Sequence, residues 1–253
     1  MAYAHVASPP DRPVRFLHTS DLHIGSTLTM PGPQPLEVVA VLAAAVQREQ
    51  ADAVLIAGDF FDHRKVHEDI VAGAAADLSR IPLRYSNEGI PTLEEVLGLV
   101  SGRAALLIEI KDQDGAMGEN VGTLELAVAA DLARYGGPVA VMSFNPHSVA
   151  AFGRAAPRVP RGLTTAAYDA KHWPALPAAT RDRLREIPDY DRLGATFVSH
   201  EARDLHRPRL AELKAKGATL LCWTIRSAEE EAAARRHADN VTFEGYLPAL
   251  ATA

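Results

Sequence analysis

The chain has 253 residues, of which 47% are hydrophobic and 23% are charged, and it contains a single cysteine. That balance is typical of a globular protein, so it excludes a disordered chain, a coiled coil and a small disulfide-bonded scaffold. The net charge is −6 and the Lys and Arg residues are scattered along the chain, which argues against binding to an extended nucleic-acid duplex.

A parallel α/β fold is predicted, because short β-rich runs alternate with Ala- and Leu-rich segments of helical length. The first residues, 1–13, contain three prolines and are expected to be disordered. Eight strands are then expected, at 14–19, 53–58, 104–110, 139–144, 162–165, 195–199, 218–225 and 240–243. Eight is the number that a TIM barrel needs, so the predicted fold is TIM-barrel-like, either complete or incomplete and hybrid.

Between the strands, seven helices are expected, at 35–50, 66–80, 92–101, 121–135, 148–156, 207–216 and 228–237. The segment 165–195 has no clear helical pattern and contains Trp173 and three prolines. It is expected to be a long loop that lies over one rim of the barrel.

The sequence also bears on where the protein works. No apolar run approaches the roughly 18 residues of a membrane-spanning helix, and residues 1–13 lack the pattern of a signal peptide. Cys222 lies in an apolar run and is expected to be buried and unreactive. These features predict a cytoplasmic protein without a membrane span.

Metal-ligating side chains follow the first two predicted strands. Asp21 and His23 come after the first, and Asp59 comes after the second. Because the carboxyl ends of parallel strands open onto one crevice, these side chains are expected to converge. Carboxylates with an imidazole suit Mn²⁺, Fe or Zn. Alternatively, these polar residues only cap the helices that follow.

The same stretch, about residues 14–80, resembles the opening of calcineurin-like metallophosphoesterases. The resemblance rests on Asp21-Leu-His23, on Gly58-Asp-Phe-Phe-Asp62 and on the wording His18-Thr-Ser-Asp-Leu-His-Ile-Gly25, which is most similar to the DNA-repair exonuclease branch. It implies that Asp21 and His23 bind one metal, that Asp59 bridges two and that Asp62 supports them. His23 is also a candidate catalytic residue. The family's later Gly-Asn-His and Gly-x-His motifs are missing from this sequence.

Five landmarks occur between about residues 81 and 248: the run 81–97, Leu106-Leu-Ile-Glu-Ile-Lys111, Val141-Met-Ser-Phe-Asn145, Cys222-Trp-Thr-Ile225 and Asn240-Val-Thr-Phe-Glu-Gly245. Together they resemble the C-terminal two-thirds of a glycerophosphodiester phosphodiesterase. This resemblance implies a TIM barrel, a Ca²⁺ or Mg²⁺ ion, and hydrolysis of a small glycerophosphodiester to glycerol 3-phosphate and an alcohol.

One landmark can be interpreted without the family. Glu109 and Lys111 are two residues apart on a predicted strand, so their side chains point to the same side. Glu109 is then a candidate ligand for a hard cation, and Lys111 a candidate catalytic residue that binds phosphate; a buried ion pair is the simpler alternative. Phe144 and Trp223 are candidates for an apolar wall of the substrate site, or else ordinary core residues.

Each resemblance lacks catalytic residues that its family keeps in the missing part. The catalytic histidines of glycerophosphodiester phosphodiesterases do not occur here in the family's motif order. We interpret the likeness of the segments around His63 and His67 to those motifs as coincidental. The chain is therefore predicted to combine a segment 14–80 with a segment 81–253 and to hydrolyse phosphodiesters weakly. The alternatives are a calcineurin-like phosphoesterase or exonuclease, and a catalytically inactive fusion or remnant. The sequence leaves the metal, the alcohol group and the oligomeric state open.

Overall fold

The computed structural model describes residues 16–19, 53–56 and 91–246. These residues contain eight strands, which lie close to the eight predicted segments. They are β1 (Phe16–Thr19), β2 (Ala53–Ile56), β3 (Ala105–Glu109), β4 (Val139–Ser143), β5 (Arg161–Thr165), β6 (Phe197–Glu201), β7 (Thr219–Ile225) and β8 (Asn240–Phe243).

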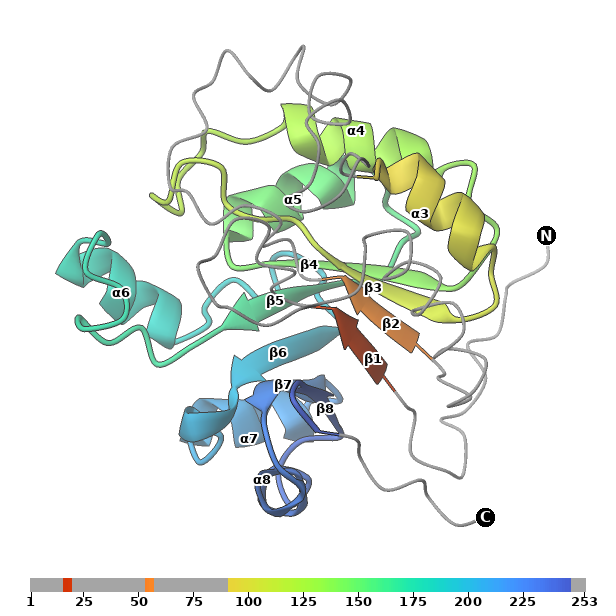
Figure 1. The fold of residues 1–253 in the computed structure, drawn as a ribbon. Helices are drawn as coiled ribbons and strands as arrows, with labels where there is room; N and C mark the ends of the chain where they lie inside the picture. Colours follow the sequence, from red (N-terminus) through yellow and green to blue (C-terminus); the bar gives the residue numbers. More distant parts are fainter. Residues whose placement is uncertain (1–15, 20–52, 57–90, 247–253) are drawn as a thin grey trace, which may run out of the picture.

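All eight strands are parallel and pair in sequence order from β1 to β8. The two outermost strands, β1 and β8, also contact each other, so the sheet curls around an axis as Figure 1 shows. The TIM-barrel-like fold predicted from the sequence is confirmed.

Six α-helices occur between residues 91 and 246: α3 (Leu93–Val100), α4 (Thr123–Leu132), α5 (Pro146–Ala155), α6 (Ala178–Arg185), α7 (Pro208–Ala215) and α8 (Ala228–Ala234). A short 3₁₀ turn, η2 (Ala202–Asp204), follows β6. The first three of these helices pack on one side of the barrel, and α7 and α8 pack on another (Figure 1). The helices predicted at 35–50 and 66–80 and the leader at 1–13 lie outside the described residues.

Local sequence explains where several helices begin. Thr92 caps α3 through a reciprocal arrangement with Glu95, and the Ser227 hydroxyl accepts a hydrogen bond from the Glu230 amide at the start of α8. Asn145 caps α5, whose first residue is Pro146, a residue that suits the first turn because it needs no amide partner. Within the described ranges, no helix is both long and apolar enough to cross a membrane.

Two layers of apolar side chains explain which face of each strand is internal. Leu107, Met142, Phe197 and Leu221 form a cluster to which strands alone contribute buried residues, so it fills the inside of the barrel. Leu106 and Ile108 instead pack with residues of α3, α4 and α5 on the outside. Since side chains alternate along a strand, Glu109 lies on the same internal face as Leu107.

β6 ends later than the sequence predicts. The expected strand stops at residue 199, but His200 pairs with Cys222 and Glu201 pairs with Trp223 of the neighbouring β7. Pairing with a longer neighbour therefore extends the strand through two polar residues, which local strand propensity does not favour. This extension brings Glu201 to the internal face at the carboxyl end of the barrel.

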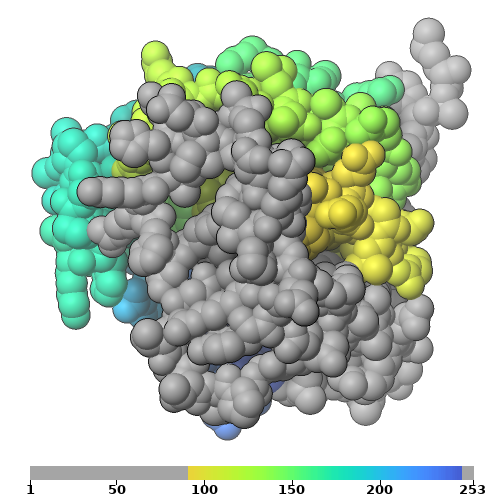
Figure 2. Space-filling view, turned by 45° about the horizontal axis from the view of Figure 1, so that its top comes forward, coloured from red at the N-terminus to blue at the C-terminus, as the bar shows by residue number. Residues whose placement is uncertain are grey.

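The predicted loop at 165–195 contains a helix that the sequence analysis missed. α6 has one buried residue, Leu184, so it lacks the repeating apolar stripe by which helices are recognised. Long-range contacts hold it instead: the Arg185 guanidinium donates to the carbonyl oxygens of Ala167 and Tyr168, at 2.8 and 3.2 Å. This segment stands out at one edge of the molecular surface (Figure 2).

Candidate active site at the carboxyl end of the barrel

Glu109 and Lys111 lie side by side at the carboxyl end of β3. Lys111 Nζ is 3.4 Å from Glu109 Oε1, and the Glu109 side chain is 5% exposed whereas that of Lys111 is 37% exposed. The amide of Ile110 still donates to the Met142 carbonyl of β4, so strand geometry continues past the end of β3. A buried carboxylate and a half-buried ammonium group thus share the internal face at the mouth of the barrel.

The negative charge of Glu109 affects the pKa of Tyr168. This side chain is fully buried, and its hydroxyl donates to the Thr164 carbonyl at 3.4 Å. Burial raises the pKa of Tyr168, and the negative charge of Glu109 raises it further. Tyr168 therefore stays protonated beside the Glu109 carboxylate.

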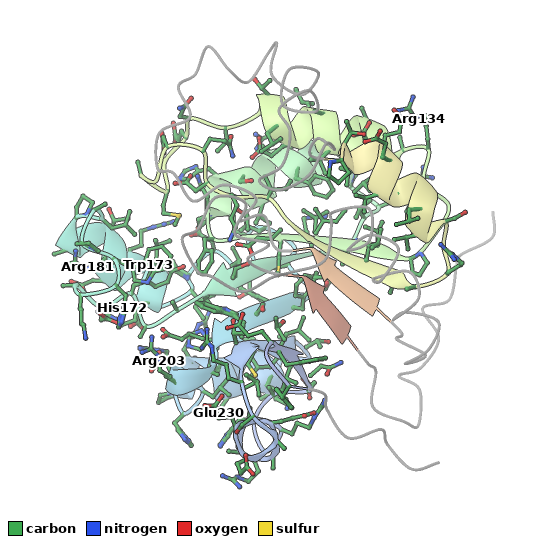
Figure 3. The ribbon with its side chains drawn as sticks, viewed as in Figure 1. Arg134, His172, Trp173, Arg181, Arg203 and Glu230 are labelled. Carbon is green, nitrogen blue, oxygen red and sulfur yellow. The ribbon has the colours of Figure 1, made fainter. Side chains whose placement is uncertain are left out.

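An aromatic cluster forms one wall of the same region. The Phe144 ring centroid lies 5.5 Å from that of Trp223 and 5.1 Å from that of Trp173, and Tyr168 contacts both Phe144 and Trp173. Edge-to-face and tilted ring pairs of this kind are favourable. The structure thus brings the predicted pair Phe144 and Trp223 together and adds two rings from the segment after β5, where Figure 3 labels Trp173.

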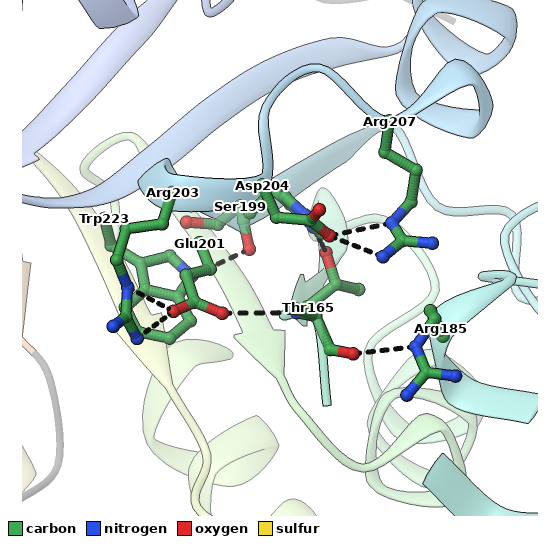
Figure 4. A network of polar contacts seen from close by, with 10 residues as sticks. Thr165, Arg185, Ser199, Glu201, Arg203, Asp204, Arg207 and Trp223 are labelled. Carbon is green, nitrogen blue, oxygen red and sulfur yellow. Dashed lines mark hydrogen bonds and ion pairs between the residues drawn. The ribbon is translucent and has the colours of Figure 1, made fainter. Parts of the chain in front are cut away.

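Glu201 is the second internal carboxylate of the region, and it comes from β6. It is buried and accepts hydrogen bonds from the Ala167 amide at 3.2 Å and from Arg203 Nε at 2.8 Å (Figure 4). The Trp223 indole donates to the Ser199 carbonyl at 3.1 Å, which fixes the ring beside Glu201. The carboxyl end of the barrel therefore carries two buried carboxylates, Glu109 and Glu201, each paired with a basic side chain.

A buried polar chain lies behind β6, on its outer face. His200 Nδ1 is 2.7 Å from the Thr165 hydroxyl, and His200 Nε2 is 3.2 Å from Asp204 Oδ2, which Arg207 also contacts (Figure 4). Burial lowers the pKa of His200 although Asp204 opposes this. A neutral ring must donate its Nε2 proton to the carboxylate, since a carboxylate only accepts, so Nδ1 accepts from Thr165. His200 is thus a structural residue.

Asn145 ties together the loops around Lys111. Its side chain is completely buried. Nδ2 donates to Asp112 Oδ1 at 2.7 Å and to the Gly118 carbonyl at 2.8 Å, while Oδ1 accepts from the His147 amide at 2.8 Å. The loop that starts beside Lys111 is therefore anchored to the start of α5.

The described residues do not complete a metal site. No group of three or more His, Cys, Asp or Glu side chains within these ranges is arranged to hold a metal ion. Glu109 can supply one oxygen ligand. The other predicted metal-site residues, Asp21, His23 and Asp59, and the supporting Asp62 lie outside the described residues, as do His63 and His67.

Sequence reasoning missed several residues of this region. Glu201 was left out because the predicted strand ended at residue 199; continuing its alternation by two positions would have placed the carboxylate on the internal face. Asn145 before Pro146 carries a local signal for the cap of α5, but its contacts with Asp112 and Gly118 carry none. Tyr168 carries no local signal for its place near Glu109.

Comparisons with known proteins bear on the family and the fold of the chain. The sequence profile of the glycerophosphoryl diester phosphodiesterase family matches residues 48–242, which includes all the described site residues and begins within the segment 14–80. No curated protein matches the chain.

Solved structures share the fold over nearly the whole chain. A phosphodiesterase from Oleispira antarctica, in complex with the product sn-glycerol-3-phosphate, is 19% identical, with a TM-score of 0.62 over 91% of this chain and 92% of that one. A glycerophosphodiester phosphodiesterase from Parabacteroides distasonis is 16% identical, with a TM-score of 0.60 over 92% and 94% of the two chains. At these identities the likeness concerns the fold.

Proposed function

Because this chain belongs to the glycerophosphoryl diester phosphodiesterase family, we propose that it hydrolyses small glycerophosphodiesters to glycerol 3-phosphate and an alcohol. The observation that carries the proposal is the Glu109–Lys111 pair. It lies at the carboxyl end of the strands, where the active sites of TIM barrels form, and an aromatic wall stands in the same region.

In the proposed reaction, water attacks phosphorus and the bond from phosphorus to the alcohol oxygen breaks. The alcohol leaves with a proton, and the phosphate stays on glycerol. Lys111 is half-exposed, so its ammonium group can bind a phosphate oxygen and stabilise negative charge that develops there. Glu109 holds Lys111 in position, and Phe144 and Trp223 exclude water on one side.

A divalent metal belongs to this proposal, Ca²⁺ or Mg²⁺ for a glycerophosphodiesterase, and it would polarise the phosphate. Glu109 is the described oxygen ligand. Asp21 follows the end of β1 by two residues and Asp59 follows the end of β2 by three. Since β1, β2 and β3 are parallel neighbours, we propose that Asp21, His23 and Asp59 supply further ligands.

We also propose that turnover is slow. General acid–base assistance raises a reaction rate by roughly 10²–10⁴-fold. His200 is fully buried on the outer face of β6 and is already hydrogen-bonded to Thr165 and Asp204, so we do not assign proton transfer to it. We propose His18, His23 and His63 as candidates for proton transfer. A cytoplasmic location stays a prediction from the single buried cysteine, Cys222.

The test is an assay of glycerol 3-phosphate released from glycerophosphocholine with added Ca²⁺, Mg²⁺ or Mn²⁺. Glu109→Gln and Lys111→Met are expected to lower kcat/KM by about 10²–10³-fold, the usual cost of removing one group that stabilises the transition state. Lys214→Met is the matched control, because it removes a lysine that pairs with Asp239 near the opposite end of the strands. Unchanged activity in both site variants would refute the assignment.

The same preparations separate the alternatives. Cleavage of bis(p-nitrophenyl) phosphate with Mn²⁺ but no turnover of glycerophosphodiesters would favour a calcineurin-like phosphoesterase or exonuclease. If the protein neither bound metal nor hydrolysed any diester, that result would establish an inactive fusion or remnant. Calorimetric titration with Mn²⁺ is expected to show lost binding in Asp21→Ala and Asp59→Ala and weaker binding in Asp62→Ala, because a supporting residue only orients the ligands.

A further inference from the structure

Two buried hydroxyl groups on the internal face of the barrel have no hydrogen-bond partner among the residues that the structure describes. Thr164 on β5 is 2% exposed and Ser199 on β6 is 0% exposed, and the side-chain oxygen of each is unpaired within the described ranges. A buried hydroxyl without a partner has lost its bonds to water and gained none in return, so such groups are uncommon in folded proteins. The two hydroxyls therefore indicate a bound group that supplies hydrogen bonds.

The two hydroxyls lie next to each other. Thr164 and Ser199 are register partners on neighbouring parallel strands. Both face inward, because Ser199 is two residues after Phe197 of the internal apolar cluster and register partners point to the same side of a sheet. Neighbouring strands are about 4.8 Å apart, and two oxygens that share one water molecule can be up to about 5.6 Å apart, twice the usual O–H···O distance. One water molecule can therefore reach both hydroxyls.

The surroundings place the pair between two features already described. On the amino-terminal side, Phe197 and the rest of the internal apolar cluster offer no good donor or acceptor. On the other side, the Tyr168 hydroxyl donates to the Thr164 carbonyl at 3.4 Å, and the Trp223 indole donates to the Ser199 carbonyl at 3.1 Å (Figure 4). The pair therefore adjoins both the apolar cluster and the rings of the candidate active site.

We propose that the hydroxyls of Thr164 and Ser199 bind one ordered water molecule inside the barrel, beneath the candidate active site. Water suits this position because a hydroxyl can both donate and accept, and a buried water commonly makes about three hydrogen bonds to polar groups that are otherwise unsatisfied. A cation is disfavoured because two neutral hydroxyls supply no negative charge. The water links β5 to β6 at the residues whose carbonyls hold Tyr168 and Trp223.

The direct test is a high-resolution crystal structure of the full chain. We expect density for one water molecule within about 3.2 Å of both side-chain oxygens. Three results would overturn the inference: no density between the two oxygens, a hydrogen bond from either hydroxyl to the other or to a backbone carbonyl, or an ion at the shorter distances of about 2.3–2.6 Å typical of a cation such as Ca²⁺.

Thermal unfolding tests the shared water in solution. Thr164→Val removes one hydroxyl and keeps the shape of the side chain, and Ser199→Ala removes the other. Each is expected to lower Tm by about 2–4 °C, the shift that one hydrogen bond corresponds to in a chain of this size. The double variant should lower Tm by clearly less than the sum, because the first substitution already weakens the water. Unpaired hydroxyls would give the opposite result, since each variant would then raise Tm and the shifts would add.

Thr165→Val is the matched control. The Thr165 hydroxyl is on the outer face and lies 2.7 Å from His200 Nδ1, so its loss should lower Tm by an amount that adds to the effect of Ser199→Ala. A raised KM for glycerophosphocholine in Thr164→Val, together with additive Tm shifts of Thr164→Val and Ser199→Ala, would show that the hydroxyls contact substrate and would overturn the water site. The crystal structure and the Tm shifts do not depend on turnover, so failure of this inference leaves the proposed function standing.

Discussion

Asn145 offers a quantitative test of how the loops around Lys111 are held. Substitution by Ala removes three side-chain hydrogen bonds from a completely buried residue: one to the Asp112 carboxylate, one to the Gly118 carbonyl and one from the His147 amide. We take about 2 kcal/mol for the bond to a charged group, about 1 for the bond to the carbonyl and about 1 for the lost helix cap. The expected loss in the free energy of unfolding is therefore about 4 kcal/mol.

The measurement is urea and thermal unfolding followed by circular dichroism. For a chain of this size, about 4 kcal/mol corresponds to a decrease in Tm of about 8–16 °C. Because Asp112 directly follows Lys111, we also expect KM for the diester to rise in Asn145→Ala. The rise should be measured below the Tm of the variant, so that unfolding does not contribute.

Ser227→Ala is the matched control. It removes a helix cap with one hydrogen bond, from the Glu230 amide at 3.2 Å, and is expected to cost about 1 kcal/mol. If Asn145→Ala destabilised the protein no more than Ser227→Ala, the reasoning that Asn145 connects α5 with the loop after β3 would be wrong.

Three further predictions concern single sites. Gly162→Ala should lower stability by about 1–3 kcal/mol in urea unfolding, because a Cβ there would collide with the Phe197 ring inside the barrel; an unchanged midpoint would contradict that packing. Cys222 should not react with a thiol reagent at pH 8 until the protein unfolds, because burial raises the pKa of its thiol to about 12; rapid modification of folded protein would disprove it. The hydrogen bond from His172 lowers the pKa of Asp169 to about 2 from its ordinary value of 3.8. The pair therefore stabilises the fold above about pH 3.8 and loses its effect as the pH falls towards 2. His172→Ala should return the Asp169 pKa towards 3.8, as measured by NMR titration. An unaltered value would exclude His172 as the cause.

The sequence by itself determined the fold class and the order of its strands. Alternation of short β-rich runs with helical segments specifies parallel α/β architecture, and all eight predicted strands have a counterpart in the structure. It also determined that Glu109 and Lys111 are neighbours, because residues two apart on a strand share a face whatever packs around them. Both conclusions depend on local periodicity, which a single sequence displays.

Tertiary structure alone decided the rest of the candidate site. Pairing with β7 extended β6 to Glu201, and contacts from Arg185 stabilised α6 where the local pattern was weak. Asn145 joins residues 27 and 33 positions away, and Thr164 and Ser199 come together where β5 pairs with β6. These features depend on which distant residues come together when the barrel closes, and neither helical nor strand periodicity encodes such contacts.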